Sequence, residues 1–149
     1  MLPEVEAVLD PEAEGVEVLA DLVLNVGRKI QARTVAEVGP AVLTHLEVLV
    51  LRHVARQPGV TPTALARQLS LKSSNTSAVL RSLEHHGLVA RTTDSSDRRI
   101  VRVIPTEATG RMVGDVSRYW EGLLGSLIPE THLHAALIAL RALDAALED

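Results

Sequence analysis

Residues 60–87 read VTPTALARQLSLKSSNTSAVLRSLEHHG and predict two helices joined by a tight turn. Thr61 is a favourable N-cap, and Pro62 suits the first turn of the first helix. The second helix is expected to begin with Ser73 as its cap and to stop at Gly87, because glycine readily takes the left-handed conformation that follows a helix. Two helices separated by three or four residues indicate a helix-turn-helix. Its predicted small core comprises Leu65, Leu69, Leu71, Val79, Leu80, Leu83 and Leu88.

The outer side of the second helix carries small and hydrogen-bonding side chains. An advance of about 100° per residue separates this side from the apolar one. The apolar side comprises Thr76, Val79, Leu80 and Leu83. The outer side comprises Ser74, Ala78, Arg81 and His85, flanked by Asn75, Ser77 and Ser82. None of these outer side chains would repel phosphate or obstruct a groove, and the second helix of a DNA-bound helix-turn-helix lies in the major groove.

A second unusual stretch, residues 91–103, reads RTTDSSDRRIVRV and lies between two segments that alternate apolar and polar residues. The segments LVART and IVRVIP predict a β-hairpin. Four of the chain's fifteen basic residues surround its tip, namely Arg91, Arg98, Arg99 and Arg102. A narrow minor groove attracts arginine, so this hairpin could reach DNA; the alternative is a meander edge that merely extends the core sheet. Asp97 could orient the guanidinium of Arg99, two residues further along an extended chain.

Two helices are predicted before the helix-turn-helix. Residues 16–38 have the apolar spacing of one helical stripe, and Asp10 followed by Pro11 fits an earlier start of the same helix. Thr44 and Glu47 have the spacing of a capping box and open the second helix.

Two further helices are predicted after the hairpin, over residues 107–127 and from Pro129 to about Leu147. The expected fold class is therefore mainly α with a small β-hairpin wing, a winged helix-turn-helix with helical segments at both ends. The length of 149 residues and the 46% hydrophobic content favour a single domain, residues 1–149. Residues 44–105 would form its winged lobe.

The charge of the chain is divided unevenly. The formal net charge is −4, yet residues 52–104 contain nine Lys and Arg against three Asp and Glu. A local excess of this kind can be an ordinary solvated surface, but here it coincides with the helix-turn-helix and the hairpin. The positive segment is therefore the candidate DNA-facing side.

Composition excludes several other classes. The chain has no Cys, which excludes disulfides, thiolate metal sites and cysteine redox sensors. One Trp, one Tyr and no Phe make an aromatic base-stacking platform improbable. The acidic N-terminus lacks the pattern of a secretory signal, and no apolar run approaches eighteen residues. A cytoplasmic protein without a membrane segment is expected.

The run from Gly59 through Gly110 resembles the winged helix-turn-helix regulators of the multiple antibiotic resistance regulator (MarR) family. The family's wing pattern is an Asp, a variable residue, an Arg, alternating strand residues and a Thr that opens a helix. It is matched by Asp97, Arg98, Arg99, strand residues 100–104 and Thr106 with Gly110. Pro105 departs from the usual Leu, but proline fits the end of an edge strand. The flanking helices extend the resemblance over nearly the whole chain.

This resemblance implies a homodimeric, sequence-specific transcription regulator, most often a repressor, with no catalytic activity. Residues 10–40 and 106–149 would form the helical dimerisation region, and two lobes would bind a pseudo-palindromic operator in double-stranded DNA. The recognition helix, residues 74–86, would lie in the major groove and the wing, residues 92–100, in the minor groove. Arg99 would be the arginine that enters the minor groove, with Arg98 as the other candidate. The residues expected to contact DNA are Lys72, Ser73, Ser74, Asn75, Ser77, Ala78, Arg81, Arg98 and Arg99, with Asp97 supporting the wing.

The resemblance also implies a possible small-molecule effector, bound between the dimerisation helices and the lobe. The sequence assigns no effector-binding residue. His45 and Arg52 could line such a pocket, although each also fits an ordinary helix surface. The Tyr119–Trp120 pair could be a pocket wall or part of a dimer core.

Metal, cofactor and enzyme functions find no support in the sequence. His85 and His86 are adjacent, and His132 and His134 lie about 200° apart on a helix, so neither pair converges on one ion. No glycine-rich phosphate loop follows a strand, and no nucleophile lies beside a plausible base. The alternative to a DNA-binding regulator is a winged-helix protein-interaction or dimerisation module without DNA binding.

Overall fold

Six helices and one two-stranded hairpin make up the part of the chain that the computed structural model describes, residues 15–38 and 43–148. In chain order they are α2 (Val16–Val38), α3 (His45–Arg56), α4 (Pro62–Gln68), α5 (Ser73–His85), β1 (Val89–Thr93), β2 (Val101–Pro105), α6 (Glu107–Leu124) and α7 (Glu130–Ala146). The predicted class, mainly helical with one hairpin, is confirmed. The predicted helix start at Asp10 and Pro11 lies outside the described residues.

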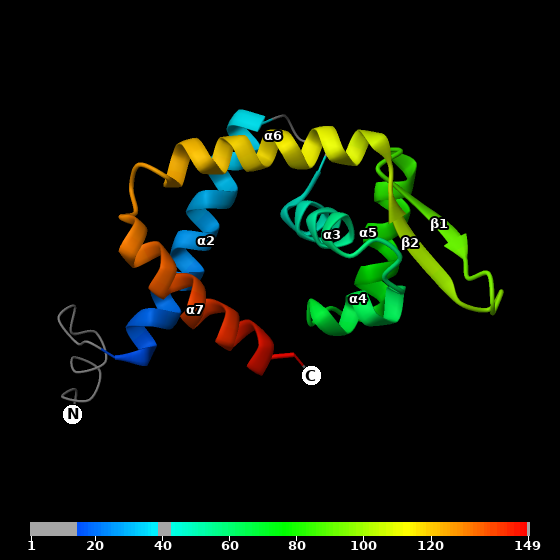
Figure 1. The fold of residues 1–149 in the computed structure, drawn as a ribbon, viewed down its shortest axis with the longest axis horizontal. Helices are drawn as coiled ribbons and strands as arrows, with labels where there is room; N and C mark the ends of the chain where they lie inside the picture. The colour runs from blue at the N-terminus through cyan, green and yellow to red at the C-terminus, as the bar shows by residue number, and fades with distance from the viewer. Residues whose placement is uncertain (1–14, 39–42, 149) are drawn as a thin grey trace, which may run out of the picture.

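Helices α3, α4 and α5 and the hairpin lie together at one end of the long helix α6, while α2 and α7 lie toward its other end (Figure 1). We call the first group, residues 44–105, the winged lobe. Its core is aliphatic, and the side chains of Leu51, Leu65, Leu80, Leu83 and Val103 are almost completely buried. These five residues come from α3, α4, α5 and β2, so one cluster holds the two helices of the helix-turn-helix against the hairpin.

Local signals set most helix ends as predicted. Thr44 and Glu47 form the capping box of α3, and the side chain of Thr61 accepts a hydrogen bond from the backbone N–H of Ala64 at the start of α4. Gly87 follows α5 with φ of 69°, a left-handed conformation that costs glycine little. At these positions the spacing of capping residues in the sequence was therefore sufficient to predict the helix ends.

The prediction that Ser73 caps α5 was wrong, and so were the limits 74–86. Lys72 is the N-cap, it makes no side-chain capping bond, and its carbonyl accepts from the backbone N–H of Thr76 at 3.0 Å. Because this bond begins the helical ladder one residue early, Ser73 is the first helical residue and His86 the C-cap. At the other end of the chain, α6 stops at Leu124, three residues before the predicted end.

The hairpin is anchored at its base. Strands β1 and β2 pair antiparallel, with Val89 opposite Pro105 and Thr93 opposite Val101. β2 also bonds to the segment before α4: Gly59 N–H donates to Val103 O at 2.8 Å, and Val103 N–H donates to Val60 O at 2.9 Å. The base therefore extends the packed lobe, as the meander alternative required, whereas the tip projects beyond it (Figure 1).

The start of α6 is joined to the turn between α5 and β1 by threonine hydroxyls. Thr106 Oγ1 donates to Gly87 O at 2.7 Å, and Thr109 Oγ1 donates to Leu88 O. Thr106 N–H also donates to Leu88 O at 3.2 Å. Helix α6 also packs against α2, so it contacts both the winged lobe and a helix outside the lobe.

Many apolar side chains outside the lobe are exposed. On α2 they include Val16, Leu19, Leu22, Leu24 and Val26. On α7, which has no buried residue, they include Leu133, Leu137, Ile138, Leu140 and Leu143. Exposed apolar surface of this extent on two helices is typical of a protein–protein interface.

Candidate nucleic-acid interface

The outer side of α5 has the composition expected of a helix that enters a groove. Thr76, Val79, Leu80 and Leu83 are buried, as their spacing predicted. Ser74, Ala78, Arg81 and His85 are exposed on the opposite side. Lys72, Ser73 and Asn75 are also exposed at the start of the helix, and Ser77 is half-buried beside them. Every residue that was predicted to contact DNA from this helix is therefore at least partly accessible.

The N-terminus of α5 adds a second property that suits an anion. The first backbone N–H groups of a helix have no partner within it, and the helix dipole places partial positive charge there. In α5 no capping side chain occupies these donors. Lys72 stands at the same end, so one phosphate could accept from the backbone and from an ammonium group together.

Glu47 is a buried carboxylate at the start of α3. The backbone N–H of Thr44 donates to its Oε2 at 2.6 Å. Burial raises the pKa of Glu47, but hydrogen bonds with Ser82 and Thr44 outweigh that effect, so the pKa lies below its ordinary value. Glu47 is therefore charged near neutral pH, and its carboxylate completes the capping box at the start of α3.

The four arginines of the hairpin divide into two structural ones and two exposed at the tip. Arg91 Nε lies 3.1 Å from Glu84 Oε2 on α5. Arg102 Nε lies 2.6 Å from Asp94 Oδ2, and Arg102 Nη1 donates to Gly59 O at 3.0 Å. These two side chains hold the hairpin to the lobe and are not available at the tip.

Asp94 is a wing residue that the sequence reasoning missed. Its Oδ1 accepts from Ser96 N–H at 2.9 Å and from the Ser96 hydroxyl at 2.5 Å, while Oδ2 accepts from Arg102. The bonds from Ser96, followed by that from Arg102, hold the pKa of Asp94 far below its usual range. The spacing of Asp94 and Ser96, two residues apart in a turn, was a signal for this role.

Arg98 and Arg99 are the exposed arginines of the tip. The side chain of Arg99 is 95% exposed, with Nε 3.8 Å from Asp97 Oδ1. The stronger contact of Asp97 is with the backbone, because Arg99 N–H donates to the same oxygen at 2.9 Å. Arg98 is exposed and makes no side-chain hydrogen bond or ion pair within the described residues. Asp97 thus shapes the turn and leaves both guanidinium groups pointing into solvent.

A cavity of about 210 Å³ lies beside the lobe, between α2, α3 and α6. Its lining comes from Gly27, Ile30, Gln31, Thr34 and Val35 of α2, His45 and Val48 of α3, and Trp120 of α6. His45 therefore lines a pocket, as one of the two sequence readings required, whereas Arg52 does not. Trp120 forms one wall, and its Nε1 donates to Thr34 Oγ1 at 2.8 Å.

Arg52 lies behind this wall. Its Cζ is 4.4 Å from the centroid of the Trp120 ring, and its Nη1 donates to Ser117 Oγ at 3.0 Å. Burial, with a smaller contribution from the charge of Arg56, lowers the pKa of Arg52. The guanidinium is thus already held by the indole face and a hydroxyl group.

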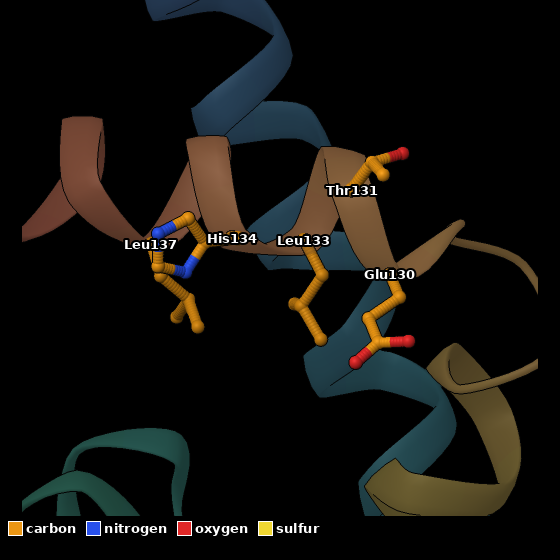
Figure 2. Close-up of a pocket in the computed structure, with 5 residues that line it drawn as sticks. All are labelled: Glu130, Thr131, Leu133, His134 and Leu137. Atoms are coloured by element: carbon orange, nitrogen blue, oxygen red, sulfur yellow. The ribbon is translucent and has the colours of Figure 1, made fainter.

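A second hollow is shallow and belongs to one helix. Figure 2 shows its five lining residues, Glu130, Thr131, Leu133, His134 and Leu137, which all come from α7. Within residues 15–38 and 43–148, no three His, Asp or Glu side chains are grouped to hold a metal ion. No helix in the same residues is long and apolar enough to cross a membrane.

Comparison with known proteins relates the winged lobe to one family. The model of the MarR family matches residues 43–101. The HTH-type transcriptional repressors Rv2887 of Mycobacterium tuberculosis and Mb2911 of Mycobacterium bovis are each 33% identical over 93 residues. The aligned part is 62% of this chain and 65% of each repressor, so the chain spans just under two thirds of these relatives.

Solved structures share the fold over a longer region. The structure of CouR from Rhodococcus jostii RHA1 bound to p-coumaroyl-CoA has a TM-score of 0.72 at 24% identity, over 89% of this chain and 95% of that one. FabT from Streptococcus pneumoniae in complex with DNA has a TM-score of 0.70 at 20% identity, over 89% and 94%. The structure of MarR has a TM-score of 0.64 at 23% identity, over 88% and 96%. The winged lobe thus matches the model of the MarR family, and the whole described chain shares its fold with solved structures that include MarR.

Proposed function

We propose that this protein is a homodimeric, sequence-specific DNA-binding transcription regulator that acts as a repressor. One observation carries the proposal. The same lobe presents an outer side of α5 with small, hydrogen-bonding side chains and two exposed arginines at the wing tip. Both surfaces lie in the segment where the positive charge of an acidic chain is concentrated. A protein-only docking module would have no need for both features.

In this proposal α5 occupies the major groove and the wing tip occupies the adjacent minor groove. Arg81 reads a base edge from the middle of α5. Lys72, Ser73 and the free N–H groups of the helix start hold a phosphate, and Ser74, Asn75, Ser77 and Ala78 line the groove. Arg99, with Arg98 beside it, enters the minor groove, while Asp97 keeps the turn in shape.

The exposed apolar sides of α2 and α7 support the proposed homodimer. In a monomer these side chains would be in contact with water, whereas a second copy of the chain would cover them in a symmetric interface. The dimerisation region would comprise residues 10–40 and 106–149, and residues 44–105 would form the DNA-binding lobe of a single domain. As a regulator of this kind, the protein would have no catalytic activity and would act where the DNA lies, in the cytoplasm.

Control by a small molecule is part of the proposal. CouR is described in complex with p-coumaroyl-CoA, and BpsR of Bordetella bronchiseptica as regulated in its DNA binding by 6-hydroxynicotinic acid. In this chain the cavity between α2, α3 and α6 adjoins the lobe, and α6, which forms one wall, begins at a threonine that bonds to the turn after α5. A ligand there could change the spacing of two recognition helices and release the operator.

The test is selection of bound fragments from random double-stranded DNA. A dimer of this kind should enrich a pseudo-palindrome with half-sites about one helical turn apart. Binding to the selected site should also weaken steeply with salt, since phosphate contacts release counterions. An absence of enrichment together with a flat salt response would leave the protein-interaction module as the better reading.

A further inference from the structure

Beyond its paired strands, the wing is connected to the lobe through the side chain of Asp94. The β1–β2 ladder ends where Thr93 pairs with Val101, and we call residues 94–100 the tip loop. Asp94 N–H closes this loop by donating to Ile100 O at 2.9 Å. Within the part of the chain that the structure describes, no other side chain of the tip loop makes a hydrogen bond or ion pair with a residue outside it.

Arg102 joins Asp94 to the body of the lobe. Its Nε donates to Asp94 Oδ2 at 2.6 Å, and its Nη1 donates to Gly59 O at 3.0 Å. Gly59 is itself fixed, because its N–H donates to Val103 O at 2.8 Å. The guanidinium is a planar group with donors at set angles, so it fixes the position of one partner relative to the other. We call these three residues the Asp94–Arg102–Gly59 brace.

The brace also reaches the turn that carries the exposed arginines. The side chain of Asp94 is only 15% exposed, and its second oxygen accepts from the backbone N–H and the hydroxyl of Ser96. One carboxylate thus holds the start of the tip loop and is itself held by the lobe. A two-stranded hairpin has little stability of its own, so without the brace the tip loop would take several directions.

We propose that Asp94 and Arg102 are positioning residues for DNA binding, which fix the direction in which the tip loop presents Arg98 and Arg99 and do not themselves contact DNA. A wing that is already held in place adds its contacts to those of α5 without the entropic cost of ordering a loop on binding. The DNA part of this inference rests on the proposed function. The ordering of the tip loop does not.

The ordering is tested on the free, full-length protein by ¹⁵N relaxation of the backbone amides of Ser96 and Arg99. We expect order parameters of about 0.85 in the unchanged protein and of about 0.6 or lower in Arg102→Met. Glu84→Ala is the matched control, because it removes the carboxylate that pairs with Arg91 nearer the base of the hairpin and should leave the tip loop ordered. Equal order parameters in the unchanged protein and Arg102→Met would overturn the brace.

The DNA part is tested with variants that separate position from charge. Asp94→Ala combined with Arg102→Met conserves the net charge, so attraction to phosphate alone predicts unchanged binding to the selected operator. We expect the double variant to bind at least about fivefold more weakly. Asp94→Ala alone should also weaken binding, although it removes a negative charge. Glu84→Ala should bind as tightly as the unchanged protein or more tightly. Unchanged or tighter binding by the folded double variant would overturn the proposal.

A thermodynamic cycle shows whether the brace acts through the two arginines. In a protein that already carries Arg98→Ala and Arg99→Ala, adding Asp94→Ala and Arg102→Met should change the affinity for the operator by less than about twofold. A further loss of about fivefold or more, with a further decrease in the salt dependence, would mean that Arg102 binds phosphate directly. That result would contradict a positioning role.

The two ideas can fail separately. If the unchanged protein selects no operator, the proposed function fails, and the relaxation data still decide whether the brace orders the tip loop. If the unchanged protein binds an operator and the charge-conserving double variant binds it equally well, the regulator stands and the positioning role is wrong.

Discussion

Arg99→Ala should weaken DNA binding while leaving the free energy of unfolding almost unchanged. The side chain is 95% exposed, and its nearest carboxylate oxygen is 3.8 Å away. Exposed pairs of this kind contribute about 0–1 kcal/mol, so we expect the unfolding free energy to change by no more than about 0.5 kcal/mol. The turn itself is held by the backbone N–H of residue 99, which alanine retains.

The expected loss of DNA affinity can be worked out from its salt dependence. A dimer presents two copies of Arg99, and each released counterion contributes about 0.9 to the slope of log K against log salt. Losing two contacts should therefore reduce the slope by about 1.8. The ratio of the two binding constants, that of the unchanged protein over that of the variant, should therefore fall by roughly tenfold when the salt concentration rises fourfold.

The assay is fluorescence anisotropy of a labelled operator at several salt concentrations, with urea unfolding in parallel. Arg118→Ala is the matched control, because Arg118 is also exposed and paired with a nearby carboxylate but lies on α6 outside the lobe. It should leave the slope unchanged. The reasoning is refuted if Arg99→Ala keeps the full slope, or if it lowers the unfolding free energy by more than about 1 kcal/mol.

Three further predictions concern the core, the recognition helix and the wing turn. Leu80→Ala should lower the unfolding free energy by about 2–5 kcal/mol in urea titrations, because Leu80 is 1% exposed within the lobe core; a loss below about 1 kcal/mol would contradict this packing. Arg81→Ala should cost about 1–3 kcal/mol and relax selection at one base pair per half-site; an equal loss on all sequences would assign Arg81 to phosphate. Asp94→Asn should lower the free energy of unfolding at neutral pH and make that free energy less dependent on pH in acid. The lowered pKa of Asp94 stabilises the fold fully above the unfolded value of about 3.9, and this contribution is lost as pH falls through the folded value. Unfolding curves that respond to acid below pH about 4 as in the unchanged protein would refute the role of Asp94.

Much of the lobe could be predicted because its signals are local. The Thr44–Glu47 capping box, the Thr61 cap and the left-handed Gly87 each depend on residues three or four positions apart. The period of the apolar residues likewise placed Leu80 and Leu83 inside and Arg81 outside. The wrong prediction that Ser73 caps α5 also concerned a local signal. Ser is a common N-cap, and nothing in the sequence showed that the helical hydrogen bonds begin at the carbonyl of Lys72.

The wing was predicted as a whole but not in its parts. Sequence proximity grouped four arginines around one tip, whereas their partners lie elsewhere: Glu84 is on α5, and Gly59 precedes α4. These contacts remove Arg91 and Arg102 from the candidate DNA surface and leave Arg98 and Arg99. No spacing rule could distinguish the four, because the deciding contact of Arg102 spans 43 residues.

The sequence by itself determined the order of helices and strands, the positive charge of the winged segment and the side-chain chemistry of the outer side of α5, because caps, periodicity and composition act within a few residues. Only the tertiary structure decided which arginines are exposed at the tip and which residues line the cavity. Thr34, His45 and Trp120 come from three separate helices, and Arg52 is withdrawn only because α3 and α6 bring it against an indole ring. Contacts between segments so far apart depend on how the helices pack, which a pattern along the chain does not encode locally.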